Sequence, residues 1–297
     1  MKLVARAPGK VNLCLFVGAL RGDGRHELVT TLESVSLADE VELVTRIVRE
    51  DEVVCQGVPG PNLASRALNG LRARGWDAPA VKVTIHKRIP VAAGMGGGSA
   101  DAAATLRLAQ RLWPVPVEVI WELAAQLGSD VPGQLDPGLV VATGAGGIIE
   151  RVSPPHGIAP HALVIVPAGE ALATPDVYAQ ADRLGSLRSP AELAHLQSRL
   201  WAAFGAAQRL PDELLVNDLQ AAAVSLCPAI EGALDAVLRA GAEQAFVSGS
   251  GPTVAGLYWG EDAASRAESA ADELAERFPS SVCAVPVPDG YGLAVIA

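Results

Sequence analysis

Residues 81–114 read VKVTIHKRIPVAAGMGGGSADAAATLRLAQRLWP, and this stretch joins three different local patterns. Val81, Val83 and Ile85 alternate with polar residues, which predicts a half-buried strand that ends before Pro90. Four glycines between positions 94 and 98 then exclude a regular element, because glycine loses more conformational freedom than any other residue when it is ordered. The stretch therefore begins as a strand that runs into a glycine-rich turn.

A helix is predicted after the turn. Ser99 is a residue of the type found in the N-cap region, and Pro114 is a natural stop for a helix. Between them, apolar residues recur with the spacing of one helical face. These residues are Ala102, Leu106, Ala109 and Trp113.

A glycine-rich turn between a strand and a helix is typical of an anion-binding site. Backbone N–H groups can converge there, and the helix N-terminus adds a partial positive charge. The missing Cβ atoms allow a phosphate to approach closely, so a di- or triphosphate is the expected ligand and a flexible loop without a ligand is the alternative. The loop is neither G-x-x-x-x-G-K-[ST] nor G-x-G-x-x-G, and the protein-kinase motifs and the acyl-transfer motif G-x-S-x-G are absent.

The rest of the chain predicts an α+β fold in two layers. The glycine- and proline-rich segment 144–161 is the candidate boundary, which gives domains at 1–155 and 156–297. Further predicted helices cover 117–127, 189–207, 217–240 and 262–277. Further predicted strands are two short ones within 31–45 around a turn at Ala38 and Asp39, then ALVIVPAG, the two flanks of the turn in QAFVSGSGPTVAGLYWG, and 282–287.

The composition is that of a globular protein. The 297 residues are 50% apolar and 19% charged, which excludes disorder, and the net charge of −10 argues against a nucleic-acid partner. No apolar run is long enough to span a membrane, and the first residues make a poor signal peptide, so a cytoplasmic protein is expected. The cysteines have no C-x-x-C spacing and are expected to be reduced core residues; they are Cys14, Cys55, Cys227 and Cys283.

Three further stretches contain residues that could carry chemistry. Lys10 interrupts the apolar run APGKVNLCLF, Asp130 follows a predicted helix in LGSDVPG, and VSGSGPTV (247–254) is a second glycine-serine turn. Taken alone, each has an ordinary interpretation. The lysine could be a solvated edge residue, the aspartate a turn former and the glycine-serine turn a tight hairpin.

Together these pieces resemble the GHMP kinase superfamily over nearly the whole chain. The three motifs of that family correspond to Pro8-Gly9-Lys10, to Pro90–Ser99 and to Ser248–Thr253. The resemblance implies a ribosomal-S5-domain-2-like N-terminal layer and a ferredoxin-like C-terminal layer. It is strongest to the branch that acts in non-mevalonate isoprenoid synthesis, through the stretches Ala7–Leu13, Gly24–Leu28, Gly128–Pro132 and Asn217–Leu219.

The resemblance also implies an activity and a site. The γ-phosphoryl group of ATP, with Mg²⁺ carried on the nucleotide and no dedicated metal cluster, would move to the tertiary 2-hydroxyl of a methylerythritol unit linked to cytidine diphosphate. Asp130 would be the base and Lys10 would offset negative charge. The nucleotide would contact Pro90, Val91, Ala92, Ala93, Gly94, Met95, Gly96, Gly97, Gly98, Ser99, Ala100 and Asn62. The acceptor would contact Asn12, Arg25, His26, Tyr178, Ser248, Gly249, Ser250 and Gly251.

The chain departs from the family pattern at a few positions. Arg25 stands where an aromatic residue is usual, Ala100 replaces a second serine, and Gly133 and Gln134 replace aromatics. Two alternatives stay open: a related kinase for a sugar, homoserine or mevalonate-type alcohol, and a binding protein that has lost catalysis. The stretch around His26 favours the cytidine substrate over the first, and the intact Lys10 and Asp130 speak against the second. The expected oligomeric state is a monomer or a homodimer, without a membrane partner.

Overall fold

The computed structural model describes residues 1–296 except 49, 59, 92 and 186, and its strands form two sheets. In the first sheet the strand order is β11-β1-β2-β4-β3, with β5 paired to β2 and β6 to β5; in the second it is β10-β7-β9-β8. The strands are β1 (Lys2–Leu20), β2 (His26–Thr45), β3 (Glu52–Cys55), β4 (Val81–His86), β5 (Leu139–Gly144), β6 (Ile148–Arg151), β7 (His161–Pro167), β8 (Gln244–Val247), β9 (Thr253–Trp259), β10 (Val282–Ala284) and β11 (Val295–Ile296).

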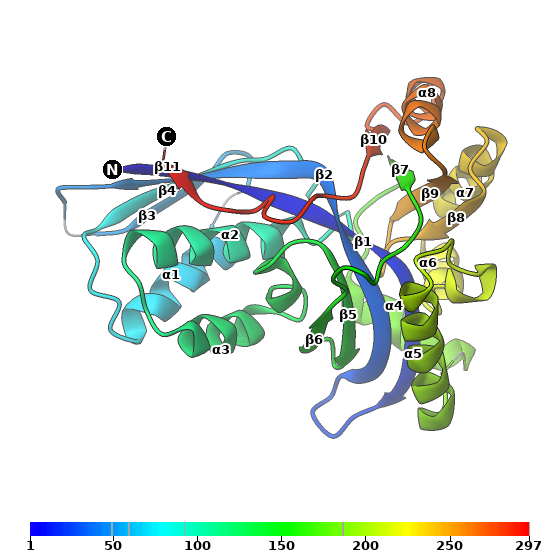
Figure 1. Cartoon of the computed structure of the whole chain (residues 1–297), viewed down its shortest axis with the longest axis horizontal. Helices are drawn as coiled ribbons and strands as arrows, with labels where there is room; N and C mark the ends of the chain where they lie inside the picture. Colours follow the sequence, from blue (N-terminus) through cyan, green and yellow to red (C-terminus); the bar gives the residue numbers. More distant parts are fainter. Residues whose placement is uncertain (49, 59, 92, 186, 297) are drawn as a thin grey trace.

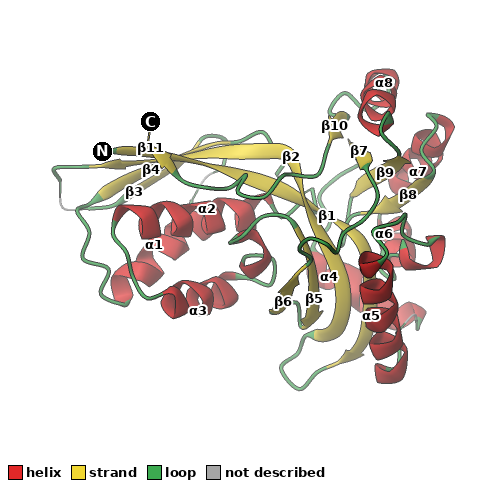
Figure 2. Cartoon of the chain, in the orientation of Figure 1, coloured by secondary structure: helices red, strands yellow, loops and turns green. Residues whose placement is uncertain are grey.

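Helices cover one face of each sheet (Figures 1 and 2). Against the first sheet pack α1 (Leu63–Ala73), α2 (Gly97–Leu112) and α3 (Val117–Leu127), followed by the short 3₁₀ turn η1 (Pro132–Gln134). The second half contains α4 (Thr174–Leu184), α5 (Pro190–Gly205), η2 (Asp212–Leu214), α6 (Gln220–Leu226), α7 (Ala229–Arg239) and α8 (Ala263–Ala275). Among the described residues, no helix is long and apolar enough to cross a membrane.

The long strands β1 and β2 belong to the first sheet and extend to the second layer, where they contact α5 (Figure 1). The predicted turn at Ala38 and Asp39 is wrong, because both residues lie inside β2 and pair with β1. Asp39 is fully buried, and its carboxylate accepts hydrogen bonds from the backbone N–H groups of Arg88 and Ile89 and from the Lys87 ammonium. Because these partners satisfy its carboxylate, Asp39 can be buried without water, and the strand continues through it.

The helix after the glycine-rich turn forms as predicted, but its start differs. Gly96 occupies the N-cap position with a φ of 65°, and Ser99 lies in the first turn of α2. A left-handed cap favours glycine, which explains why the sequence places glycine rather than serine there. The predicted helix over 217–240 is two helices, because Pro228 lacks the N–H group that would continue α6.

Helices α1 and α4 were not predicted. Asn62 caps α1 by accepting a hydrogen bond from the Ser65 N–H, a signal that the sequence contains. All four cysteines are free, but only Cys14 is buried, where burial raises the pKa of its thiol to about 11; the others are half-buried rather than core residues.

Candidate active site

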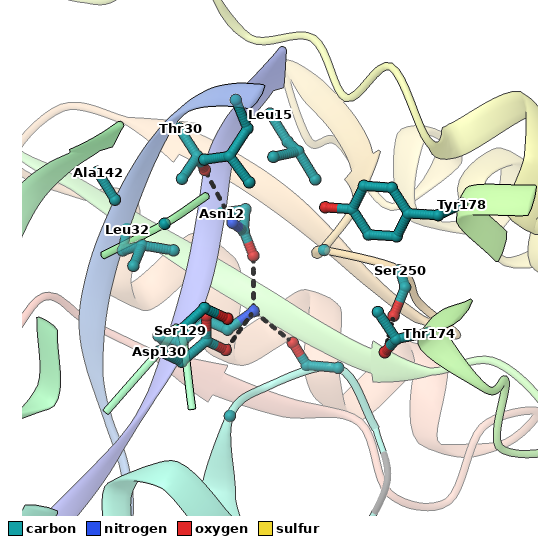
Figure 3. Close-up of a pocket in the computed structure, with 16 residues that line it drawn as sticks. Asn12, Leu15, Thr30, Leu32, Ser129, Asp130, Ala142, Thr174, Tyr178 and Ser250 are labelled. Atoms are coloured by element: carbon teal, nitrogen blue, oxygen red, sulfur yellow. Dashed lines mark hydrogen bonds and ion pairs between the residues drawn. The ribbon is translucent and has the colours of Figure 1, made fainter. Parts of the chain in front are cut away.

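Three adjoining cavities lie along the glycine-rich turn and the paired parts of β1 and β2 around Asn12 and Thr30. The central one has a volume of about 280 Å³ and contains Lys10 and Asp130 (Figure 3). A cavity of about 290 Å³ lies on the other side of the turn and shares Gly94 and Gly96 with the central cavity. A third, of about 570 Å³, shares Tyr178 with the central cavity and extends toward His26. The glycine-rich turn thus separates the central cavity from the one behind it, and Tyr178 separates the central cavity from the third.

Lys10 is buried in the central cavity, so its interpretation as a solvated edge residue is wrong. The pairing of β1 with β2 shifts register between Pro8 and Lys10, and the Lys10 side chain is 6% exposed. Its Nζ donates to Asn12 Oδ1 at 2.7 Å and to the Gly94 carbonyl at 2.8 Å, and lies 3.6 Å from Asp130 Oδ2. These acceptors offset the cost of removing the ammonium group from water.

Asn12 and Thr30 fix the direction of the Lys10 side chain. The Asn12 Nδ2 donates to Thr30 Oγ1 at 2.8 Å, and the Thr30 hydroxyl donates to the Cys14 carbonyl at 2.5 Å. Figure 3 shows Asn12 between Thr30 and the ammonium group. Because its amide nitrogen faces Thr30, the amide oxygen of Asn12 must face Lys10.

Asp130 lies between α3 and η1 with a third of its side chain exposed, so solvent or a ligand can reach its carboxylate. Across the cavity, Tyr178 on α4 turns its hydroxyl toward the interior (Figure 3). Burial, with the negative charge of Asp130 adding to it, raises the pKa of Tyr178 to about 12. The phenol therefore stays a hydrogen-bond donor at every pH at which the protein would work.

The glycine-rich turn is packed where side chains would not fit. Gly94 has a φ of 76°, and a Cβ atom there would lie 2.8 Å from the carbonyl oxygens of Ser248 and Gly251. A Cβ atom at Gly96 would lie 3.1 Å from the Lys10 Cγ. The N-terminus of α2 has no side-chain cap, so its first N–H groups remain available to an anion.

The second glycine-serine turn closes over the central cavity from the other layer. Asn217 shapes it by donating from Nδ2 to the carbonyls of Val247 and Gly249, both at 2.7 Å. Gly249 has a φ of 60°, and a Cβ atom there would lie 3.1 Å from the Lys10 Nζ. The turn is therefore part of the Lys10 environment, and Asn217 is a supporting residue whose role the sequence did not reveal.

The cavity behind the turn contains a buried charge cluster that the sequence analysis also missed. The Lys87 ammonium donates to Asp39 Oδ2 at 2.5 Å and to Asp101 Oδ2 at 2.9 Å. Burial raises the pKa of Asp101 to about 7, opposed by the charge of Lys87 and assisted by that of Asp39. The nearest signal in the sequence was the alternation of residues 81–86, which places Lys87 directly after β4.

The third cavity contains the stacked pair His26 and Tyr178, whose ring centroids are 5.1 Å apart at an interplanar angle of 26°. Arg25 lies at its rim in the loop between β1 and β2. Its side chain is 59% exposed, and its guanidinium pairs with Asp23 Oδ2 at 3.0 Å. Asp182 on α4 also lines this cavity.

The structure brings most of the predicted residues to these cavities. Ser248 and Gly251 support the second turn rather than line a cavity, Ala100 is buried inside α2, and Ala92 lies outside the described residues. Lining the central cavity are Lys10, Asn12, Gly94, Gly96, Asp130, Tyr178, Gly249 and Ser250. Lining the cavity behind the turn are Asn62, Pro90, Val91, Ala93, Gly94, Met95, Gly96, Gly97, Gly98 and Ser99. Lining the third are Arg25, His26 and Tyr178.

Comparison with known proteins agrees with the fold. Residues 62–146 match the N-terminal domain of the GHMP kinases and residues 191–277 match their C-terminal domain. The chain belongs to the GHMP kinases and is a small-molecule kinase, which confirms the family, the fold and the enzyme class that the three motifs implied. Membership of a kinase family also implies the use of ATP.

Particular relatives carry a more specific name. The 4-diphosphocytidyl-2-C-methyl-D-erythritol kinase of Corynebacterium efficiens is 44% identical, over 92% of this chain and 90% of its own. The enzyme of that name from Mycobacterium tuberculosis is 42% identical, over 95% and 88%. A crystal structure of 4-(cytidine 5'-diphospho)-2C-methyl-D-erythritol kinase matches with a TM-score of 0.75 and 30% identity, covering 96% of this chain and 100% of its own. A homoserine kinase from Cytophaga hutchinsonii, with a TM-score of 0.70 and 18% identity over 99% and 97%, shares the fold.

Proposed function

We propose that this kinase phosphorylates the 2-hydroxyl of 4-diphosphocytidyl-2-C-methyl-D-erythritol with ATP, in cytoplasmic isoprenoid precursor synthesis. The observation that carries the proposal is the Lys10–Asp130 pair, 3.6 Å apart, in a cavity between the glycine-rich turn and the His26–Tyr178 pair. Relatives at 41–44% identity that bear the name of this kinase support the same acceptor.

The residues behind the turn fit a nucleotide. Bound ATP would supply the phosphoryl group, and the Mg²⁺ carried with it would neutralise part of the phosphate charge. The N–H groups of Gly97, Gly98 and Ser99 at the uncapped start of α2 would hold the phosphates, and the Ser99 hydroxyl would hold a phosphate or the cation. Among the described residues, Glu40, Glu42 and His86 are the one group with the spacing of a metal site, and they line none of the three cavities.

In the central cavity, Asp130 and Lys10 would divide the catalytic work. The Asp130 carboxylate would accept the proton of the acceptor hydroxyl, for which it must lie within hydrogen-bond distance of that oxygen. The Lys10 ammonium, fixed by Asn12 and by the Gly94 carbonyl, would offset negative charge as the phosphoryl group passes. Because both groups are held before the substrate arrives, little reorganisation is needed during transfer.

The third cavity would hold the cytosine of the acceptor. Its planar side chains, His26 and Tyr178, suit a planar base, and Arg25 at the rim could cover another face. The methylerythritol end of the acceptor would then reach past Tyr178 to Asp130. A monomer or a homodimer would serve equally, since all these residues come from one chain.

The test is ATP turnover measured with four candidate acceptors: the cytidine diphosphate compound, homoserine, mevalonate and galactose. Rapid, acceptor-dependent formation of ADP with the cytidine compound alone is the expected result. Faster turnover with one of the other alcohols would assign the chain to another activity of the family. No turnover with any acceptor, together with intact ATP binding, would favour a binding protein.

A further inference from the structure

The third cavity contains a side-chain pair, His26 and Asp182, of which Asp182 has no role in the proposed function. His26 on β2 has a side chain that is 6% exposed, and its Nε2 lies 2.9 Å from Oδ1 of Asp182 on α4. The two residues are 156 positions apart and come from the two halves of the chain. A carboxylate only accepts hydrogen bonds, so Nε2 is the ring nitrogen that carries the hydrogen.

This contact decides what the other ring nitrogen can do. A neutral imidazole has one N–H group and one lone pair, and the partner of one nitrogen selects the tautomer. With Nε2–H donated to Asp182, Nδ1 is left as an acceptor, and none of the described residues hydrogen-bonds it. The Tyr178 ring, stacked at 5.1 Å, fixes the plane of the imidazole.

We propose that Asp182 is a positioning residue that makes His26 select cytosine over uracil. The proposal rests on the proposed function, because it takes a cytidine diphosphate acceptor as given. The exocyclic amino group of cytosine donates hydrogen bonds, whereas the carbonyl at the same position of uracil accepts them. The Nδ1 lone pair of His26 accepts from the amino group and repels the carbonyl. Asp182 acts through His26, by fixing its tautomer.

The exposure of Asp182 makes the proposal testable by substitution. Its side chain is 41% exposed on the surface of α4, so Asp182→Ala leaves the fold intact. Asp176→Asn is the matched control, because it removes one carboxylate from the first turn of the same helix and Asp176 lines none of the three cavities. The probes are CDP and UDP, whose affinities are measured by calorimetry.

The wild type is expected to bind CDP at least about tenfold more tightly than UDP. Asp182→Ala should bring the ratio of the CDP and UDP affinities close to one, mainly by weakening CDP binding. Asp176→Asn should leave this ratio unchanged. An unchanged ratio in Asp182→Ala would overturn the proposal while leaving turnover of the cytidine acceptor, and so the proposed function, untouched. A wild type that binds CDP and UDP equally would overturn it as well.

A second measurement needs no variant of Asp182. The ¹⁵N chemical shifts of the imidazole distinguish the two tautomers, and His26→Gln assigns the His26 signals. The expected wild-type pattern has the hydrogen on Nε2. A hydrogen on Nδ1 in the free protein would overturn the proposal, whatever the nucleotide affinities are.

Discussion

Lys10 is a cation inside a strand, and its burial is tolerable only because acceptors surround it. Two neutral oxygens and one carboxylate lie near its Nζ, and the residue is 5% exposed. Removing one partner of a buried charge leaves that charge uncompensated, which is costly. The loss of a residue such as Asn12 should therefore affect both stability and turnover.

Asp130 should matter for turnover far more than for nucleotide binding. Asp130→Asn keeps the shape of the side chain but cannot accept the proton of the acceptor hydroxyl. Turnover should fall by roughly a hundredfold or more, which is a typical general-base contribution. The measurement is steady-state ADP formation together with ATP affinity by calorimetry. Near-normal turnover in this variant would exclude Asp130 as the base.

Some residues of the site could be found from the sequence and others could not. Lys10 and Asp130 stand in motifs whose members are neighbours in the chain. Asn217 stands in a stretch that carries the family resemblance, but its contact with Val247 spans 30 positions, and the contact of Asp182 with His26 spans 156. No local pattern predicts contacts of that length. Their roles appear only once the two layers are brought together.

At the scale of elements, the glycine-rich turn should respond differently at neighbouring positions. Gly96→Ala requires a residue at a φ of 65°, which costs roughly 1–2 kcal/mol, and its Cβ would press on the Lys10 Cγ at 3.1 Å. At Gly98 the nearest atom to a Cβ is the Leu63 Cδ1 at 3.8 Å, and φ is not positive. Gly96→Ala should therefore lower kcat by displacing Lys10.

Gly98→Ala is the control for that change. It should keep the stability and kcat of the wild type, and any loss should fall on the KM for ATP, because Gly98 lines the cavity that we propose for the nucleotide. Thermal unfolding and steady-state kinetics of both variants separate these effects. Equal kcat values in the two variants would show that the packing of Gly96 against Lys10 has no catalytic role.

Arg25, in the loop between β1 and β2, stands where the family resemblance predicts an aromatic residue. If Arg25 stacks on the cytosine, Arg25→Ala should raise the acceptor KM by about threefold to tenfold, and Arg25→Tyr should restore most of the loss. If its charge acts on the diphosphate instead, both variants should lose affinity, and less so at higher salt. Acceptor KM values at two salt concentrations decide between the two. Unchanged KM values would mean that Arg25 stays paired with Asp23 and does not contact the bound acceptor.

Elements were predictable where local periodicity and stop signals agreed. The strand at 81–86 and the helices after the turn follow their patterns closely. The continuous β2 was not predictable, because the partners of Asp39 lie about 50 residues away at Lys87–Ile89. The break between α6 and α7 could have been predicted from Pro228, since proline rarely continues a helix.

At the scale of the molecule, a buried ion pair joins the two layers. His161 at the start of β7 places Nε2 at 2.6 Å from Glu33 Oε2 on β2 and Nδ1 at 2.9 Å from the Ala159 carbonyl. Burial lowers the pKa of His161, but the charge of Glu33 and these hydrogen bonds outweigh it, so the pKa is raised above 6.5. Both ring nitrogens face acceptors, as the charged form requires.

The contribution of this pair to stability should depend on pH. Because the folded-state pKa is raised, the stabilisation is fully present below about pH 6.5 and is lost as pH rises through the folded-state value. At pH 6, Glu33→Gln should lower the free energy of unfolding by about 3–5 kcal/mol, and by less at pH 9. Urea unfolding at the two pH values measures this, with the exposed Glu118→Gln as control. A difference that grows with pH would contradict the assignment.

The last strand, β11, belongs to the first sheet, although it follows the second sheet in the sequence. Val295 and Ile296 of β11 pair with Val4 and Leu3 of β1, and Arg107 donates from Nε to the Gly292 carbonyl at 2.8 Å. Figure 1 accordingly shows the N and C labels side by side. The division at residues 155 and 156 stays a prediction, but the final residues pack on the first sheet, not the second.

In terms of topology, the second sheet and its helices form a unit inserted into the first layer, because the chain enters this unit between β6 and β7 and leaves it between β10 and β11. Two connections therefore join the inserted unit to the first layer, and the pairing of β11 with β1 holds the second connection in place. A protease that cuts one connection alone would leave the two fragments associated; release of the inserted unit would need both cuts and the separation of the shared core around β1 and β2.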